Sequence, residues 1–342
     1  MLSARSLATQ ALRPHSLGKM QKMALSASQT LSSADDSQLP TMPQARHFPA
    51  MKTPMLPPDT FKGKVALISG GGTGLGKGMA TMLSQLGAQV CIMSRRQKVL
   101  DEAAAEVTAL TGGAVLPVSA DVRDPAAVTA AVDACVDRLG VPDIVINNAA
   151  GNFISPTERL SANAWRTVVD IVLNGTAYLT LDVGKRWIKA GRGGVFLSIT
   201  TTYTRLGSGF VTPSASAKSG VETLTKSLAS EWGRYGIRLN CIAPGPIETE
   251  GAFSRLDPSG EFRRVGVKAI PAGRFGEPEE LTNLAAYLVS DYSSWISGES
   301  VALDGAGLPF RGGEFNQLSR VTPEQWDLME QMIRSTNKQS KL

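Results

Sequence analysis

A glycine-rich turn carries the clearest chemical signal in the sequence. It comprises Ser69-Gly70-Gly71-Gly72-Thr73-Gly74-Leu75-Gly76, and it follows an apolar run and opens a helical pattern. Glycines let the main chain turn tightly and approach a pyrophosphate, and the N-terminus of a helix favours the negative charge. Between a strand and a helix, this spacing predicts the binding of a dinucleotide.

Two arginines, Arg95 and Arg96, end the next predicted strand. A unit that selects NAD places a carboxylate here to accept a hydrogen bond from the adenosine ribose, whereas a guanidinium suits a 2′-phosphate. The pair therefore favours NADP over NAD, the alternative being a solvated start of the following helix. After the third and fourth predicted strands, we expect Asp121 and Val122 at the adenine edge and Asn148 in a small-residue turn that the cofactor passes.

Histidine is nearly absent from the sequence. The two histidines, His15 and His47, both precede the first globular pattern. A Ser-His-Asp triad, a Cys-His dyad and a His-ligated metal site are therefore excluded within this chain. Cys91, Cys135 and Cys241 are far apart, which indicates neither a disulfide framework nor a zinc ribbon. The chemistry must use Tyr, Lys, Ser, Asn, Asp or a cofactor.

Both ends of the chain have sequences that are typical of targeting signals. The formal net charge is +5, but residues 1–60 hold six basic and three acidic residues, so the remainder carries only +2 and gives little support to nucleic-acid binding. Residues 1–34 have the basic, Ser-rich and acid-free composition of a mitochondrial transit peptide, or of a merely disordered tail, and we expect a leader and disordered linker over 1–58. The final Ser340-Lys341-Leu342 matches the peroxisomal targeting tripeptide, so a mitochondrial and a peroxisomal signal compete in this chain.

Short β-branched runs alternate with helical patterns between Lys64 and Gly307. This alternation predicts an α/β domain over 59–310, a doubly wound (Rossmann) sheet of seven parallel strands with helices on both faces. Ligands bind at the carboxyl ends of such strands, and 249–271 is a candidate lid. Strands are expected at 64–69, 89–93, 114–119, 143–146, 194–199, 237–242 and 300–303. Helices are expected near 75–86, 96–110, 125–139, 161–190, 213–235 and 277–290.

Residues 311–342 are expected to form a helical extension. Thr322-Pro323-Glu324-Gln325 has the pattern of a helix N-terminus, and Trp326, Met329 and Ile333 would then share a face for packing or subunit contact. The sequence contains no apolar run of 18 residues, so we expect no membrane-spanning helix.

Together these segments resemble the short-chain dehydrogenase/reductase family over residues 61–307. The resemblance rests on the spacing of Gly70, Gly74 and Gly76, on the turn 147–151, on Lys218 and on the run 244–249. It implies a nicotinamide cofactor whose ribose is bound by Lys218. It also implies cofactor contacts from the run Pro244, Gly245, Pro246 and Ile247.

Two departures from the family pattern are informative. Ser214 stands four residues before Lys218, where the family has tyrosine, and Val172 stands where a helix asparagine is usual. A serine hydroxyl is too weakly acidic to replace a phenol, so the usual alcohol/ketone proton relay is broken. A tyrosine remains nearby as Tyr203, just after the fifth predicted strand.

This rearranged set resembles the 2,4-dienoyl-CoA reductases, and Tyr203 favours their mitochondrial type. The matching phrases lie at 151–156, 214–218, 251–258 and 314–316. The resemblance implies a homotetramer that uses NADPH to reduce a 2,4-dienoyl-CoA to the trans-3-enoyl-CoA in β-oxidation of polyunsaturated fatty acids. Hydride would add at C5 and a proton at the α carbon of the resulting dienolate.

The resemblance also implies the roles of particular residues. Tyr203 and Asn152 are the candidate donors to the developing oxyanion, and Lys218 with Ser214 would hold the nicotinamide ribose. Substrate contacts are expected from Arg123, Phe153, Ser161 and Arg255. The plainer alternatives are a loop tyrosine, a turn asparagine and solvated arginines. A 3-oxoacyl or 3-hydroxyacyl oxidoreductase that uses NADP and a non-enzymatic NADPH-binding protein remain as other function classes.

Overall fold

A single parallel sheet organises the chain. The computed structural model describes residues 41–247, 249 and 261–339, and its sheet has seven strands in the order β3-β2-β1-β4-β5-β6-β7, all neighbours parallel. The predicted doubly wound sheet is therefore confirmed. The strands are β1 (Val65–Ser69), β2 (Gln89–Ser94), β3 (Val115–Ser119), β4 (Ile144–Asn147), β5 (Gly194–Ile199), β6 (Ile237–Pro244) and β7 (Ser300–Leu303).

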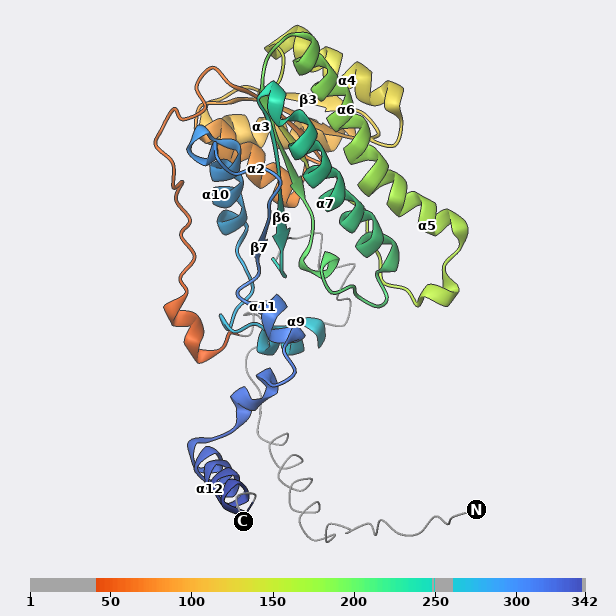
Figure 1. Cartoon of the computed structure of the whole chain (residues 1–342). Helices are drawn as coiled ribbons and strands as arrows, with labels where there is room; N and C mark the ends of the chain where they lie inside the picture. Colours follow the sequence, from red (N-terminus) through yellow and green to blue (C-terminus); the bar gives the residue numbers. More distant parts are fainter. Residues whose placement is uncertain (1–40, 248, 250–260, 340–342) are drawn as a thin grey trace, which may run out of the picture. The chain divides into compact units, whose positions relative to one another are not determined.

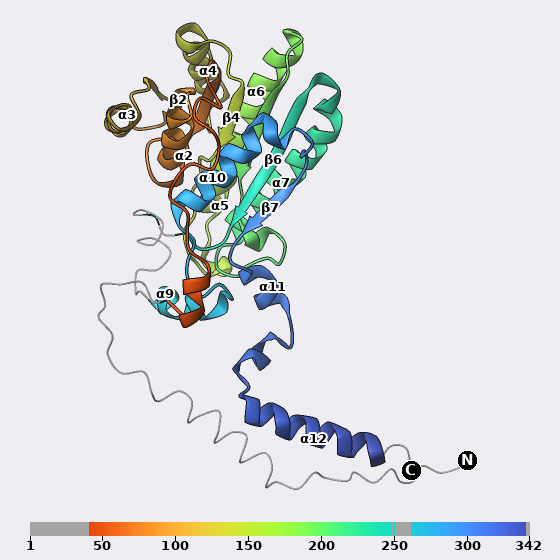
Figure 2. The same cartoon turned by 90° about the vertical axis from the view of Figure 1, so that its left-hand side faces the viewer.

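Helices cover both faces of the sheet (Figures 1 and 2). Alternate residues of β1 divide between two cores: Ala66 and Ile68 belong to one, Val65 and Leu67 to the other. Strands buried on both faces explain why they are continuous apolar runs in the sequence. The first face carries α2 (Gly74–Gln85), α3 (Gln97–Thr111) and α10 (Pro278–Val289), and the second carries α4 (Pro125–Leu139), α6 (Gly175–Lys189) and α7 (Thr212–Trp232).

The helix expected over 161–190 is not one regular helix. It consists of α5 (Ala162–Val169) and α6, joined by a π-helical turn over Asp170–Asn174. In this turn the amide of Gly175 donates to the carbonyl of Asp170, five residues back. Helical patterns lie on both sides of this turn, so the sequence predicted one continuous helix.

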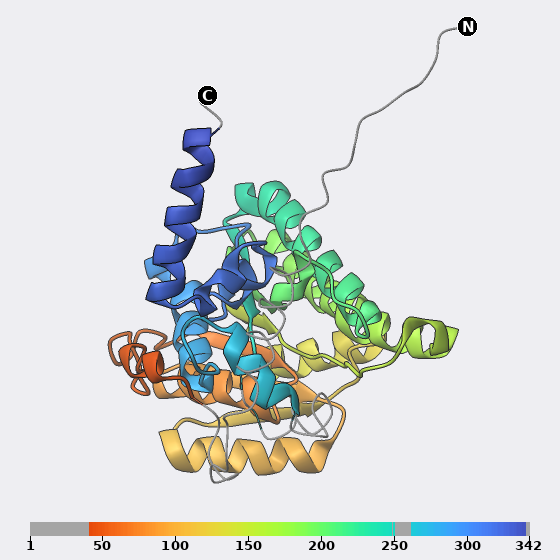
Figure 3. The same cartoon turned by 90° about the horizontal axis from the view of Figure 1, so that it is seen from below.

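The carboxyl ends of the strands are covered by short elements. Figure 1 shows α9 (Glu261–Gly266) and α11 (Gly307–Gly312) beyond the ends of β6 and β7, and Figure 3 is the view onto this end. The predicted lid therefore contains a helix, while its residues 250–260 lie outside the described part of the chain, as do the two address segments 1–34 and 340–342.

The C-terminal extension contains α12 (Pro323–Gln339). Its N-terminus has the predicted reciprocal cap, since Gln325 Oε1 accepts from the Thr322 amide at 2.9 Å and the Gln325 amide donates to Thr322 Oγ1 at 3.3 Å. Trp326 and Ile333 are 40% and 55% exposed, so the described residues leave their shared face uncovered. None of the helices in the described ranges combines the length and the apolar character needed to cross a membrane.

Residues 42–55 pack along the domain, although the sequence predicted a linker there. The amide of Met42 donates to the carbonyl of Gly273 at 2.7 Å. The Asn283 side chain accepts from the Met55 amide at 2.8 Å and donates to the Thr53 carbonyl at 3.0 Å. Because these main-chain groups bond to the domain instead of water, this part of the predicted linker is an ordered segment.

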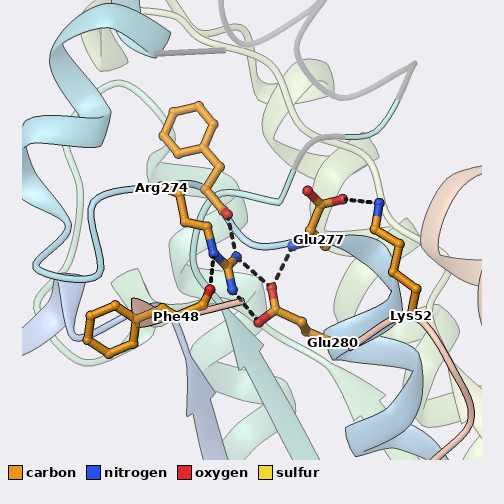
Figure 4. Close-up of polar contacts among 6 residues, drawn as sticks. Phe48, Lys52, Arg274, Glu277 and Glu280 are labelled. Carbon is orange, nitrogen blue, oxygen red and sulfur yellow. Dashed lines mark hydrogen bonds and ion pairs between the residues drawn. The ribbon is translucent and has the colours of Figure 1, made fainter. Parts of the chain in front are cut away.

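An arginine fixes the middle of this segment (Figure 4). Arg274 donates to the Phe48 carbonyl at 2.7 Å and forms a two-pronged pair with Glu280 at 2.8 and 2.7 Å. The pairing lowers the pKa of the Glu280 carboxyl. Lys52 adds a weaker pair with Glu277 at 3.6 Å. The segment is thereby tied to the start of α10 and to the loop that leaves the predicted lid.

Candidate active site

The glycine turn closes against itself and against the fourth strand. Gly70 has a φ of +67°, which side chains other than glycine rarely adopt. A Cβ on Gly76 would lie 2.2 Å from the carbonyl oxygen of Gly70. Asn148 holds the turn from the other side, because its Nδ2 donates to the carbonyls of Ser69 and Gly70 at 3.2 and 3.1 Å. The turn therefore excludes side chains at positions 70 and 76.

A cleft of about 220 Å³ runs from this turn past the ends of β2, β3 and β4. It lies at the amino end of α2, where the helix favours a phosphate, so the residues present fit a dinucleotide. Arg95 and Arg96 are exposed at its rim, while Val122 is buried. Its lining residues are Gly70, Gly72, Thr73, Met93, Ser94, Arg95, Arg96, Val99, Ala120, Asp121, Val122, Ala149, Ala150 and Ile171.

Asp121 and Arg123 pair with each other. Arg123 Nε lies 3.0 Å from both carboxylate oxygens, and its Nη2 lies 2.6 Å from Oδ2. This hydrogen bonding lowers the pKa of Asp121. The sequence assigned the two side chains to different ligands, whereas the structure shows that one orients the other at the rim of the cleft.

Tyr203, Asn152 and Ser214 form one cluster. Asn152 Nδ2 donates to Tyr203 Oη at 3.4 Å, and Tyr203 Oη lies 3.1 Å from Ser214 Oγ. The three residues come from different elements: the loop after β4, the turn Thr202–Thr204 after β5, and the first part of α7. Tyr203 thus reaches the side chain at the position where the family pattern has its own tyrosine.

Lys218 lies one helical turn beyond Ser214 on α7 and is buried. Its Nζ donates to the carbonyl of Ile199, the last residue of β5. Burial lowers the pKa of Lys218 to about 8, because a low-dielectric environment disfavours the charged form. The ammonium is therefore oriented by main chain at the strand end and holds its proton less firmly than an exposed lysine.

Val172, which stands where the family pattern has a helix asparagine, is packed in an apolar cluster. It lies in the π-helical turn, is fully buried and packs with Val168, Ala217 and Val221. This contact between the π-helical turn and α7 is entirely apolar. The side chain consequently offers no polar group to a proton relay.

The run after β6 is shaped by close packing. A Cβ on Gly245 would lie 2.7 Å from the Asp304 side chain, so only glycine fits there. Ile247 is buried and bridges to Gly276, just before α10. Pro244 and Pro246 flank Gly245. The run 244–247 therefore lies at the carboxyl end of β6.

Three of the four expected substrate residues lie in the described part of the chain, and each has a contact of its own there. Phe153 is half-buried and packs on the apolar cluster around Val172. Ser161 caps α5, its Oγ accepting from the Ala164 amide at 3.1 Å. Arg123 is held by Asp121 as described, and Arg255 lies outside the described residues. The substrate role of Ser161 stays a prediction beside this capping role.

Two polar residues were missed in the sequence. The hydroxyl of Ser69 accepts from the amides of Asn148 and Ala149, both at 3.1 Å, and so fixes the two strand ends together. A strand-end serine before a glycine turn could have indicated this role. Glu222 is buried on α7, four residues after Lys218, and nothing in the sequence marked it. Within the described ranges, no group of three or more His, Cys, Asp and Glu side chains could hold a metal ion.

Comparisons with known proteins identify the relatives of this chain. Residues 70–307 match the family model described as Enoyl-(Acyl carrier protein) reductase. An uncharacterized oxidoreductase of Caenorhabditis elegans is 50% identical over 86% of this chain and 96% of its own. A probable 2,4-dienoyl-CoA reductase of the same organism, described as producing (3E)-enoyl-CoA, is 45% identical over 84% of this chain and 95% of its own.

A vertebrate relative and a solved structure are also similar to this chain. The peroxisomal 2,4-dienoyl-CoA reductase of Danio rerio is 37% identical over 72% of this chain and 82% of its own. The crystal structure of a short chain dehydrogenase from Bacillus anthracis is 43% identical, with a TM-score of 0.66 over 72% of this chain and 97% of its own. The chain therefore belongs to the short-chain dehydrogenase/reductase family and is an oxidoreductase of the kind that uses a nicotinamide cofactor.

Proposed function

We propose that the protein reduces a 2,4-dienoyl-CoA to the trans-3-enoyl-CoA with NADPH. One observation carries the proposal: Tyr203 Oη lies between Asn152 and Ser214, while the position four residues before Lys218 is a serine. This cluster can donate hydrogen bonds to an oxygen, but it lacks the phenol–lysine relay of alcohol chemistry. The relatives named 2,4-dienoyl-CoA reductases support the same substrate class.

The reaction requires an oxyanion to be stabilised. When bound, the reduced nicotinamide supplies a hydride to C5 of the dienoyl thioester. The π electrons then move toward the thioester oxygen, and a proton added at the α carbon leaves one double bond between C3 and C4. Tyr203 and Asn152 would donate to that oxygen, and Tyr203 is placed to deliver or relay the proton. Removing one such donor costs about 3–4 kcal/mol of barrier.

Lys218 and Ser214 would hold the ribose next to the nicotinamide. Ser214 is buried and contacts Tyr203, so a ligand bound by both α7 residues would be aligned with the tyrosine. The run Pro244–Ile247 closes the same edge of the sheet. Together these groups would orient the cofactor and keep water from the reacting carbons.

The choice of NADPH over NADH rests on Arg95 and Arg96. Both are exposed at the rim of the cleft, where a 2′-phosphate would meet two guanidinium groups. The phosphates of CoA are proposed to meet Arg123 and Arg255, with Phe153 and Ser161 nearby. Because Arg123 is paired with Asp121, we expect it to act as an oriented group, not a free charge.

The proposal is tested with purified protein and two variants, Tyr203→Phe and Asn152→Ala. Both should lose most of kcat with a 2,4-dienoyl-CoA while the Kd for NADPH stays near that of the wild type. Wild-type kcat in both variants would refute the oxyanion role. Faster oxidation of NADPH with a 3-oxoacyl-CoA than with the dienoyl-CoA would favour the 3-oxoacyl oxidoreductase, and oxidation with neither would favour a binding protein.

We propose a homotetramer and a role in the β-oxidation of polyunsaturated fatty acids. The leader composition supports the mitochondrial matrix, while Ser340-Lys341-Leu342 and the peroxisomal relative support peroxisomes. Fluorescent fusions with either end masked separate the two. Sedimentation of the purified chain tests the assembly, and a monomer at micromolar concentration would contradict it.

A further inference from the structure

A buried carboxylate lies behind the cluster and takes no part in the chemistry proposed above. Glu222 is on α7, one turn beyond Lys218, and only 7% of it is exposed. No lysine or arginine pairs with it in the part of the chain that the structure describes. A carboxylate without a cation is costly to bury unless hydrogen bonds replace its water.

Three hydroxyl groups supply those bonds to a single oxygen. Glu222 Oε1 accepts from Thr200 Oγ1 at 3.0 Å, from Thr204 Oγ1 at 2.9 Å and from Ser300 Oγ at 2.9 Å. Both threonine hydroxyls also lie near main-chain carbonyls: Thr204 Oγ1 is 2.8 Å from the Thr201 carbonyl, and Thr200 Oγ1 is 3.2 Å from that of Ile242. Their hydrogens are therefore shared between the side-chain and main-chain acceptors.

The two threonines bracket the tyrosine of the cluster. Thr200 is the first residue after β5, and Thr204 ends the short 3-10 turn Thr202–Thr204 that contains Tyr203. The Tyr203 hydroxyl itself contacts Asn152 and Ser214. Glu222 thus ties one residue on each side of Tyr203 to α7, the same helix that carries Ser214 and Lys218.

We propose that Glu222 is a positioning residue for Tyr203. It sets the distance between the tyrosine turn and α7, and hence the place of the phenol relative to the bound substrate and to Ser214. This inference rests on the proposed function, because it needs Tyr203 to act on the reacting oxygen. A displacement of about 1 Å at such a group is expected to slow the reaction on the order of a hundredfold.

The first test compares variants that remove different members of the network. Thr204→Val removes one hydroxyl at nearly constant volume on the tyrosine turn, whereas Ser300→Ala removes the hydroxyl that comes from β7. We expect Thr204→Val to lower kcat about tenfold or more and Ser300→Ala to keep it within about twofold, each with an unchanged Kd for NADPH. Equal losses of kcat in the two variants would overturn the proposal.

The second test is a double-mutant cycle in kcat. Glu222→Ala should lower kcat, Glu222→Gln should restore part of it through its remaining carbonyl oxygen, and the exposed Glu231→Ala on the same helix serves as the control. When Tyr203→Phe is added to Glu222→Ala, we expect no loss beyond that of Tyr203→Phe alone, because the carboxylate acts through the phenol.

The outcomes of the cycle separate the two proposals. If Tyr203→Phe alone lowers kcat but the losses of the two single variants multiply in the double variant, the role of Glu222 is overturned and that of Tyr203 stands. If Tyr203→Phe alone keeps wild-type kcat with the dienoyl-CoA, the proposed oxyanion role of Tyr203 fails and the role of Glu222 falls with it, while the substrate class stands. If the wild type does not oxidise NADPH with the dienoyl-CoA, the proposed function itself fails. Should Glu222→Ala not fold, the same cycle is measured with Glu222→Gln or Thr204→Val in its place, each combined with Tyr203→Phe.

Discussion

Replacing Lys218 with methionine should change how the stability of the protein depends on pH. Burial lowers the pKa of Lys218 from 10.5 to about 8 in the folded protein. In the unfolded chain the amine keeps its proton up to about pH 10.5. Between these two values, unfolding takes up a proton, so raising the pH favours the folded state.

The size of the effect follows from the gap between the two pKa values. The two pKa values differ by about 2.5, and each pH unit of difference corresponds to about 1.4 kcal/mol, so the whole effect is about 3 kcal/mol. Below pH 8 the wild type carries the full cost of a buried ammonium, and by pH 10.5 that cost is gone. The variant also leaves the Ile199 carbonyl without its donor, which costs about 1–3 kcal/mol at every pH.

The assay is urea unfolding of the cofactor-free wild type and Lys218→Met between pH 7 and pH 10.5, followed by circular dichroism. The free energy of unfolding of the wild type minus that of the variant should rise by about 3 kcal/mol across the range. Lys226→Met, at an exposed position on the same helix, should run parallel to the wild type. A difference that stays constant with pH would refute the reasoning, since Lys218 would then keep its proton in the folded state.

Three further variants test the geometry of the cofactor cleft and of the N-terminal segment. Gly76→Ala should weaken NADPH binding at least tenfold in calorimetry, because its Cβ would lie 2.2 Å from a main-chain oxygen. Arg95→Ala combined with Arg96→Ala should reduce the ratio of NADPH to NADH affinity about tenfold or more, measured by fluorescence titration. Arg274→Ala should destabilise the protein by about 2–3 kcal/mol and speed proteolysis within residues 42–55, because Glu280 would stay part-buried without its partner.

Matched controls separate these effects from general damage. A Cβ on Gly233 would meet no atom within 4 Å, and this residue has an ordinary φ of −54°, so the NADPH affinity of Gly233→Ala should match the wild type. Lys98→Ala should not alter the preference between the two cofactors. Arg334→Ala breaks an exposed pair, 76% and 59% accessible, and should change stability by less than about 0.5 kcal/mol. An effect in any control equal to that of its partner would refute the corresponding assignment.

The sheet and its cofactor turn were predictable because local signals and long-range packing agree there. Apolar β-branched runs buried on both faces appear directly in the sequence, and Gly76 is required by a contact only six residues away. The π-helical turn over Asp170–Asn174 was not predictable, since one extra residue in a turn leaves apolar periodicity almost unchanged. The packing of residues 42–55 depends on Asn283 and Arg274, more than 200 positions away, and a proline-rich segment carries no sign of them.

The same division holds for the candidate site. Tyr203, Asn152 and Ser214 were suggested by a resemblance, and the structure brings them into one cluster. The pairing of Arg123 with Asp121 and the capping by Ser161 are short-range contacts that the sequence could have indicated. The role of Glu222 depends on three strand-end and turn hydroxyls that meet only in the folded chain, so no sequence pattern could have revealed it.

The most direct test of the central claim follows the hydride. The enzyme is given NADPH that carries deuterium at the transferred position together with a 2,4-dienoyl-CoA, and the product is examined by nuclear magnetic resonance. We predict a trans-3-enoyl-CoA with deuterium at C5 and a solvent-derived proton at the α carbon. Absence of label from C5 would contradict the account. So would label at C3 of an alcohol product when a 3-oxoacyl-CoA is supplied in place of the dienoyl-CoA and is reduced faster.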